Sequence, residues 1–317
     1  GTVYHFSPWE ELMFNPVHLV RLPTADPQSV GTKVTLGPKA ERPLELSIPI
    51  ILTGMSYGGA LSKQVRIALA KASTAAGTAT NTGEGAYLPE EREAAAKYIY
   101  QYHRGRWPHG NKKEFYALAD MIEIQLGQGA QASAPQTTPA EKIDEEFRDV
   151  FGLEEGEDAV IASRLDGLES ADDLKHLVSR LKEETGGVPI SYKFAASHYL
   201  EKEIELAVEA GVDVIVIDGA EAGTHAGQPL LEDAFGLPTM HALVRAVDYL
   251  EEKGVRDQIS IIASGGLFSP DHFLKAMALG ADAVYVGTAA VMAMIHTQMV
   301  ESSPFEPPTQ LALYSGR

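Results

Sequence analysis

Short apolar runs alternate with helix-length amphipathic segments through most of the chain, and this alternation limits the fold more than any other feature. Several of the amphipathic segments end at a glycine, as helix C-caps often do. Strands that alternate with helices form parallel sheets. The sequence therefore predicts an α/β fold, a closed (β/α)8 TIM barrel, with an open doubly wound sheet as the alternative. The eight runs are PIILTG (49–54), TATNTG (78–83), KYIYQYH (97–103), MIEIQL (121–126), PISYKF (189–194), VDVIVID (212–218), ISIIASGG (259–266) and AVYVGT (283–288).

The segments outside these runs suggest how the chain is divided. Residues 1–47 are rich in proline and lack periodicity, so we expect an N-terminal arm that packs on a barrel formed by residues 48–300. Residues 131–167 have low hydrophobicity and interrupt the strand pattern. We interpret them as a rim excursion, either a solvated lobe or a lid, and residues 301–317 as a C-terminal tail.

Composition excludes several classes of function. Among the 317 residues, 26 Lys and Arg stand against 44 Asp and Glu, a formal charge of −18 that disfavours nucleic acid and anionic membranes as partners. No long apolar run or signal peptide is recognisable, so we expect a cytoplasmic protein. Cysteine is absent, which excludes disulfides, thiolate nucleophiles and cysteine-ligated clusters. No HxH or HExxH pair occurs, and we predict no metal site.

Glycine and polar residues follow most of the predicted strands, where TIM-barrel enzymes place their chemistry. Glycine there allows backbone N–H groups to approach a ligand closely. The last two loops carry Gly265 and Gly266, then Gly287 and Thr288, just before predicted helix starts. Loops of this kind after the final two strands form the usual phosphate site of the fold. The sequence therefore favours a phosphate-bearing cofactor or substrate over plain turn glycines.

Three ionisable residues at predicted strand ends are candidates for catalysis. Lys193 ends an alternating strand and could anchor an anionic substrate or stabilise developing charge, although a lysine that reaches to the rim is the alternative. Glu84 is the single carboxylate in TATNTGEGAY and could accept a hydrogen bond from a substrate amine or imine. It could also be a simple turn acid. His225 is either a proton donor or a solvated loop histidine.

Eight segments, taken in order, resemble the FMN-binding domain of the glutamate synthase family from about residue 48 to residue 299. They are GMSYGGALS, TNTGEGAYLPEE, YHRGRW, ADMIEIQLGQGA, YKF, GTHAG, ASGGL and VGTAA. The resemblance implies a TIM barrel with FMN at its mouth, and it places Glu84 and Lys193 beside the flavin and a 2-oxo acid. The cofactor-binding positions that we carry over are Gly54, Met55, Ser56, Asn81, Gln101, Gln125, Lys193, Gly223, Thr224, Ser264, Gly265, Gly266, Gly287 and Thr288.

The chain also departs from the family pattern. Gln125 and Gln131 stand where the synthases usually have lysines, and the cysteines for a [3Fe-4S] cluster are missing. The ending without these cysteines resembles a shorter, stand-alone branch of the family, and the loss of the two cations weakens the case for 2-oxoglutarate. Without an amidotransferase domain or an N-terminal cysteine, glutamine-dependent glutamate synthesis by this chain alone is excluded.

We therefore predict an FMN-dependent oxidoreductase of glutamate-synthase-like type that exchanges hydride with a carbon bearing an amine or hydroxyl. Its expected partners are a small-molecule substrate and an electron donor, either a nicotinamide or a protein, and a homo-oligomer is left open. Two alternatives remain at this stage. One is another FMN barrel enzyme, of the 2-hydroxy-acid oxidase or isopentenyl-diphosphate isomerase type. The other is an FMN-binding electron-transfer subunit without a substrate of its own.

Overall fold

Eight parallel strands close into a barrel in this computed structural model, which describes residues 7–26, 30–224 and 227–294. The order around the barrel is β10-β11-β12-β3-β4-β5-β6-β9, with each strand next to its neighbour along the chain apart from a small insertion. The predicted TIM barrel is confirmed, and the open sheet is wrong. The strands are β3 (Ile50–Leu52), β4 (Thr80–Asn81), β5 (Tyr98–Tyr102), β6 (Met121–Gln125), β9 (Ile190–Ala195), β10 (Val214–Asp218), β11 (Ser260–Ser264) and β12 (Ala283–Val286).

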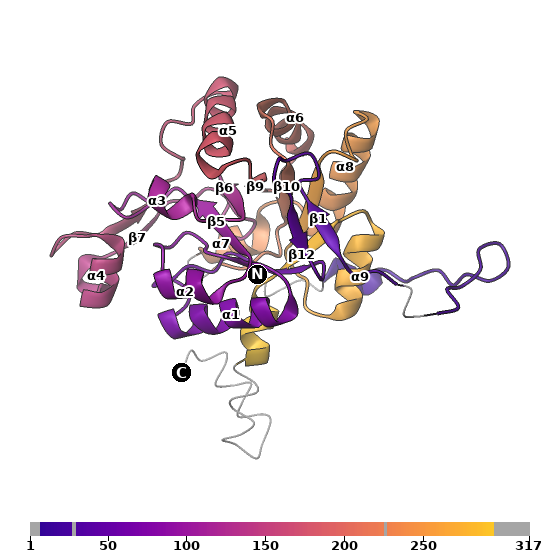
Figure 1. The fold of residues 1–317 in the computed structure, drawn as a ribbon, viewed down its shortest axis with the longest axis horizontal. Coiled ribbons are helices and arrows are strands. Elements are labelled where there is room, and N and C mark those ends of the chain that lie inside the picture. The colour runs from indigo at the N-terminus through magenta and orange to yellow at the C-terminus, as the bar shows by residue number, and fades with distance from the viewer. Residues whose placement is uncertain (1–6, 27–29, 225–226, 295–317) are drawn as a thin grey trace, which may run out of the picture.

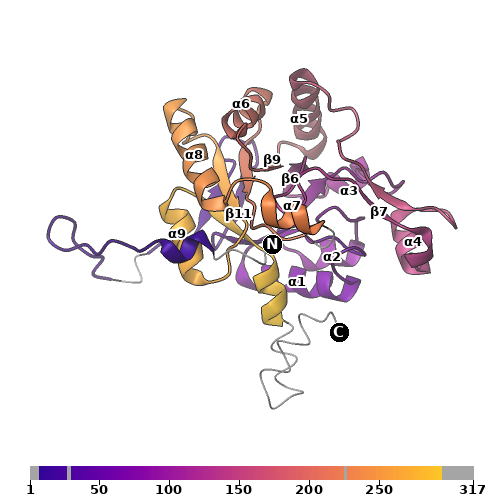
Figure 2. The same cartoon turned by 180° about the vertical axis from the view of Figure 1, so that it is seen from behind.

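Helices surround the barrel, with α1, α5, α6, α8 and α9 on its outside (Figures 1 and 2). Three of them end at a glycine in the left-handed region, Gly77, Gly186 or Gly211, as the sequence indicated, and the first two of these, α1 and α5, also begin after a serine. Residues 288–294 are also helical. The helices are α1 (Lys63–Ala76), α2 (Pro89–Ala94), α3 (Lys113–Tyr116), α5 (Ala171–Thr185), α6 (Leu200–Ala210), α7 (Pro229–Ala234), α8 (Thr239–Glu252) and α9 (Pro270–Ala278).

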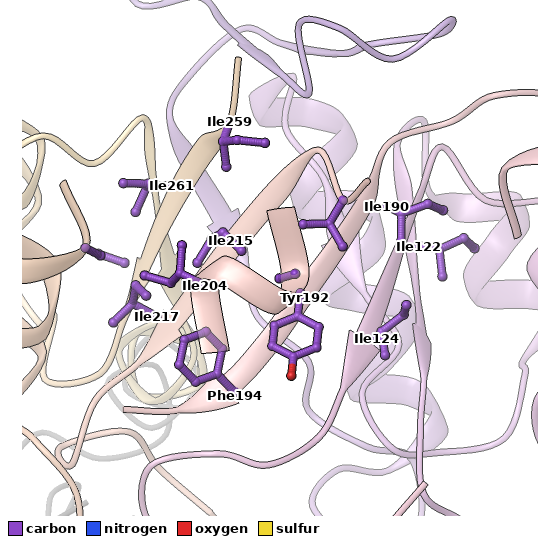
Figure 3. Packing of buried hydrophobic residues seen from close by; sticks show 14 of the residues in the cluster. Ile122, Ile124, Ile190, Tyr192, Phe194, Ile204, Ile215, Ile217, Ile259 and Ile261 are labelled. Atoms are coloured by element: carbon purple, nitrogen blue, oxygen red, sulfur yellow. The ribbon is translucent and has the colours of Figure 1, made fainter. Parts of the chain in front are cut away.

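The strands divide their side chains between two cores because successive residues face opposite sides of a sheet. On β6, Ile122 and Ile124 join the outer core beneath the helices, whereas Met121 joins the inner core of the barrel. Ile215 and Val216 divide in the same way on β10. Figure 3 shows outer-core side chains from β6, β9, β10 and β11, together with Ile204 of α6.

The N-terminal segment covers the end of the barrel at which the strands begin. Strands β1 (Val34–Leu36) and β2 (Leu44–Leu46) pair antiparallel, and their leucines join the inner core. Gly37 N–H donates to Ser260 Oγ (3.1 Å) at the start of β11, so this hairpin lies at the amino ends of the strands. The 3-10 helix η1 (Pro8–Glu11) docks on α9, where Lys275 Nζ donates to the Trp9 carbonyl (2.8 Å). Residues 12–26 extend away beyond α9 (Figures 1 and 2).

The predicted rim excursion has a small core of its own. Strands β7 (Gln136–Thr138) and β8 (Ala159–Ile161) pair antiparallel, and η3 (Ala140–Lys142) and α4 (Glu145–Phe151) lie between them. Phe147 and Phe151 stack with ring centroids 3.9 Å apart and pack against Tyr57 and Trp107 of the barrel loops. The segment therefore rests on the barrel mouth through aromatic packing, which its low average hydrophobicity did not indicate.

Candidate active site

The loops after β10, β11 and β12 converge at the carboxyl end of the barrel. Gly265 (φ 116°) and Gly266 (φ 68°) need a conformation that L side chains rarely adopt. A Cβ on Gly265 would lie 2.9 Å from Ala222 N, and one on Gly223 would lie 3.5 Å from Thr288 Oγ1. The structure thus brings one group of the predicted cofactor-binding residues together: Gly223, Thr224, Ser264, Gly265, Gly266, Gly287 and Thr288.

The loops after β3 and β4 touch through glycines. A Cβ on Gly54 would lie 2.9 Å from Asn81 Oδ1, and one on Gly83 would lie 2.8 Å from the Met55 and Ser56 nitrogens. A Cβ on Gly85 would lie 2.9 Å from Tyr57 N. The glycines on either side of Glu84 are therefore explained by the backbone that passes beside them.

A buried polar layer lies inside the barrel just below these loops. Glu123 of β6 is fully buried and accepts hydrogen bonds at Oε1 from Asn81 Nδ2 (2.8 Å) and Gln101 Nε2 (2.7 Å). Its Oε2 accepts from the Tyr285 hydroxyl (2.6 Å). Burial, with the Glu123 carboxylate adding to it, raises the pKa of Tyr285, so the phenol stays protonated and donates. Asn81 and Gln101 were both predicted to bind the cofactor. In the structure, each donates a hydrogen bond to the buried Glu123 carboxylate.

Lys193 points into the barrel mouth and keeps its charge. Its Nζ lies 3.6 Å from Asp218 Oδ1, and its side chain is 3% exposed. Burial by itself would lower the pKa of this lysine. The Asp218 carboxylate, with those of Glu123 and Glu84 farther off, outweighs burial and raises the pKa above its ordinary value. Lys193 is therefore an ammonium group at ordinary pH, suited to stabilise negative charge and unsuited to act as a base.

Glu84 is not the lone acid that its glycine-rich loop suggested. The residue is 8% exposed, and its Oε1 accepts a hydrogen bond from Arg104 Nη2 (3.1 Å). Arg104 follows β5, its side chain is fully buried, and its Nε donates to Gln125 Oε1 (3.2 Å). The mouth thus holds a second buried cation, which lies next to Gln125.

The loop after β6 crosses the mouth towards β10. Gly129 N–H donates to Asp218 Oδ2 (2.9 Å), and Gln128 Nε2 donates to Thr224 Oγ1 (3.2 Å) and Gln131 Oε1 (2.8 Å). Gln131 is itself buried. The hydrogen bond from this loop fixes the position of the Asp218 carboxylate, which forms the ion pair with Lys193.

A buried ion pair braces the loops from outside the mouth. Arg66 of α1 donates from Nη1 to the Met55 carbonyl (2.7 Å) and from Nη2 to the Asn81 carbonyl (2.7 Å). Its Nη2 also pairs with Glu91, and both side chains are almost completely buried. Arg66 therefore links the two loops that carry predicted cofactor-binding residues.

His103 shapes the turn that leads into Arg104. Its Nδ1 accepts from Gly105 N–H (3.0 Å), and its ring packs on Trp107 with centroids 4.9 Å apart. Burial lowers the pKa of His103 to about 3. Because Nδ1 is an acceptor, the neutral ring carries its proton on Nε2.

The lowered pKa of His103 predicts a loss of stability in acid. Below about pH 6.5 the unfolded chain takes up a proton that the native ring refuses, so stability falls with pH until about pH 3. His103→Asn retains a local acceptor and removes the titration. We expect the drop in unfolding free energy between pH 7 and pH 5 to be about 2 kcal/mol smaller in this variant. Urea unfolding measures it, with His198→Asn on the exposed surface as control, and equal drops in His103→Asn and wild type would contradict it.

The remaining histidines, the metal prediction and the membrane prediction can be compared with the structure. His225 lies outside the described residues. His198 is exposed, whereas His272 is buried against Glu10 (3.0 Å). Among the described residues, no group of three His, Asp or Glu is placed to hold a metal ion. Within the same residues, no helix is both long and apolar enough to cross a membrane.

Several residues of the site were missed by the sequence analysis. Asp218 and Glu123 are carboxylates in otherwise apolar strands, at inward-facing positions, and this was an available signal. Glu91, His103 and Arg104 lie within segments that resemble the family but were assigned no role, and nothing in the local pattern marked Arg66 or Tyr285. The missed residues are Arg66, Glu91, His103, Arg104, Glu123, Asp218 and Tyr285.

Comparison with known sequences assigns the family. The sequence profile described as the conserved region in glutamate synthase matches residues 11–301. The chain belongs to the glutamate synthase family. A glutamate synthase large subunit-like protein of Rhizobium meliloti (strain 1021) is 34% identical over 296 residues, which cover 93% of this chain and 66% of that protein. An archaeal glutamate synthase [NADPH] of Methanocaldococcus jannaschii is 38% identical over 264 residues, covering 83% and 51%. This member of the family thus spans about half to two thirds of these curated relatives.

Solved structures support the fold assignment of this glutamate synthase family member. A mandelate oxidase with benzoyl-formic acid superposes with a TM-score of 0.53 at 18% identity, covering 83% of this chain and 69% of the other. A mandelate oxidase mutant with a C4a-OH-FMN adduct also gives 0.53 at 18% identity, covering 84% and 71%. At this identity the likeness concerns the barrel alone.

Proposed function

We propose that the chain binds FMN at the barrel mouth and acts as an oxidoreductase on a substrate of the amino, imino or 2-oxo acid type. The observation that carries the proposal is Lys193, a buried and charged lysine at the mouth of a glutamate synthase family barrel. Bound FMN would supply hydride exchange at its N5 atom. Electrons would come from a nicotinamide or from a protein donor.

The residues at the mouth fit a phosphate-bearing flavin. In the loops after β11 and β12, a Cβ on Gly265 or Gly287 would lie within 3 Å of other protein atoms, so glycine allows these loops to pack closely. Residue 288 then begins a helical stretch whose first N–H groups favour an anion. On the opposite side of the barrel, β5 and β6 present buried side chains with hydrogen-bond donors. The loops after β11 and β12 would hold the phosphate of a flavin, and Lys193 lies at the same mouth.

The protein's own contributions are charge and orientation. The Lys193 ammonium stabilises negative charge as it develops on a bound group, and burial makes this interaction stronger than in water. Glu84, held by Arg104, presents a carboxylate that can accept a hydrogen bond from a substrate nitrogen. The aromatic side chains of the excursion pack against Tyr57 and Trp107 on this side of the mouth, where they would reduce access of water.

Reconstitution with flavins tests the proposal. We expect the purified chain to bind FMN stoichiometrically and to prefer it to FAD, because no GxGxxG loop follows an opening strand to hold a pyrophosphate. Heat release followed by mass spectrometry identifies the bound flavin. Anaerobic reduction, followed by flavin absorbance in the presence of 2-oxo acids with and without ammonia, tests the substrate class. Bound FAD, or no flavin after reconstitution, would overturn the proposal.

A pair of glycine variants locates the phosphate. In Gly265→Ala the new Cβ would meet Thr239 Oγ1 at 2.6 Å and Ala222 N at 2.9 Å, so we expect FMN affinity to fall by roughly tenfold or more. Gly254→Ala is the control, since Gly254 also has positive φ (67°) but no neighbour within 4 Å of its Cβ. Similar FMN affinities in the two variants would remove the β11 loop from the site.

A further inference from the structure

The guanidinium of Arg104 is only partly used by its protein neighbours. Of its five N–H donors, those accounted for are on Nε, which donates to Gln125, and on Nη2, which donates to Glu84. Nη1 is completely buried and has no partner among the described residues. A buried charged donor without an acceptor costs considerable free energy, so this atom points to an acceptor that the protein itself does not provide.

A second unpaired donor belongs to the neighbouring side chain. Gln125 Oε1 accepts from Arg104 Nε, which fixes the orientation of the amide and leaves Nε2 as a donor. Gln125 Nε2 is also buried without a partner among the described residues. In the barrel register Gln125 lies directly beside Lys193, whose ammonium has no acceptor capacity. Three donor groups, two of them cationic, therefore lie close together at the ends of β5, β6 and β9.

The position of this cluster favours a substrate group over the cofactor phosphate. Strands β5 and β6 lie across the barrel from β11 and β12, whose loops hold the proposed phosphate site. Glu84, the acid bound to Arg104, lines a small cavity between the mouth and the excursion. Tyr57, Trp107 and Phe147 form other parts of its wall. Arg104 and Gln125 do not line this cavity, which reaches the cluster only at Glu84.

We propose that Arg104 and Gln125 form a subsite for the carboxylate of the substrate. This inference rests on the proposed function, because it assigns the acid end of an amino or 2-oxo acid whose reacting carbon faces the flavin. A carboxylate matches the planar donors of a guanidinium and can accept from both Nη1 and an amide N–H. Arg104 thus supplies a cation at this subsite, with Gln125 as a neutral donor beside it.

Binding to the flavin-free chain tests the subsite without requiring turnover. The probes are pyruvate and pyruvamide, which differ by replacement of the carboxylate with a neutral amide. Trp107, one of the two tryptophans, lines the cavity and reports binding through its fluorescence. We expect Arg104→Gln to weaken pyruvate binding roughly tenfold or more and to leave pyruvamide binding unchanged, with partial recovery in Arg104→Lys. FMN affinity should remain that of the wild type.

Arg106→Gln is the matched control, because Arg106 lies two residues away and pairs with Asp166 on the surface. If Arg104→Gln does not fold because Glu84 loses its partner, the double variant Glu84→Gln/Arg104→Gln removes both charges, and the same loss of pyruvate binding is expected. Wild-type pyruvate affinity in a folded Arg104 variant overturns the subsite. Weakened FMN binding with unchanged pyruvate binding also overturns it, since the donors would then serve the cofactor. A third outcome is that neither the wild type nor any variant binds FMN, while pyruvate binding still depends on Arg104. In that case the subsite stands and the proposed function fails.

Discussion

Lys193→Met should slow the reaction of the flavin with its substrate by roughly a hundredfold or more, the loss typical of removing a preorganised charge from an active site. Lys193 is buried at the barrel mouth and held as an ammonium by Asp218, 3.6 Å away. Its charge therefore acts where solvent cannot screen it. Rapid mixing of reduced or oxidised enzyme with its substrate, once the anaerobic screen has found one, measures the rate.

Two variants separate this effect from a loss of stability. Lys193→Met/Asp218→Asn removes both charges of the pair, so any penalty from an unpaired Asp218 disappears while the catalytic loss remains. Lys182→Met breaks a more exposed ion pair at the amino end of β10, in which Lys182 Nζ lies 2.9 Å from Asp213 Oδ1. This variant should leave the rate unchanged. Wild-type rates in Lys193→Met, with full flavin content, would place this lysine outside the chemistry.

Arg66→Met should lower the free energy of unfolding by about 3–5 kcal/mol, the usual cost of removing one member of a buried ion pair. The substitution leaves Glu91 buried without its cation and takes donors from the Met55 and Asn81 carbonyls. Burial raises the pKa of Glu91 even with Arg66 opposing it. Losing Arg66 should raise that pKa further, so the native state should bind this proton up to a higher pH. The loss of stability should therefore be largest at neutral pH and smaller in acid. Urea unfolding at both pH values measures it.

The matched control for Arg66 is Arg245→Met. Arg245 forms a two-point pair with Glu201 between α8 and α6, but both side chains are about one third exposed. Exposed pairs of this kind contribute only about 0–1 kcal/mol. Arg66→Met/Glu91→Leu should recover much of the loss by removing the unpaired acid. Equal destabilisation in Arg66→Met and Arg245→Met would show that the buried pair does not brace the loops.

The sequence by itself determined the barrel and the end at which its chemistry is placed. Strand alternation is a local property, since inward and outward positions follow from a period of two, and helix ends follow from local capping. The runs ending at Leu126 and Phe194 therefore predicted β6 and β9 closely. Because all parallel strands of a closed barrel end on one rim, the loops carrying Glu84 and Gly265 could be assigned to the same face before any contact was known.

Only the tertiary structure decided which side chains meet on that rim. Glu84 and Arg104 lie 20 residues apart and belong to different loops, so no period in the sequence relates them. The low hydrophobicity of residues 131–167 likewise concealed a core, because Phe147 and Phe151 bury their rings against barrel residues far away in the sequence. Ion pairs and aromatic contacts of this kind depend on strand register and barrel closure, which are properties of the whole chain. The sequence shows which side chains are able to form such contacts. The closed barrel determines which of them lie close enough to do so.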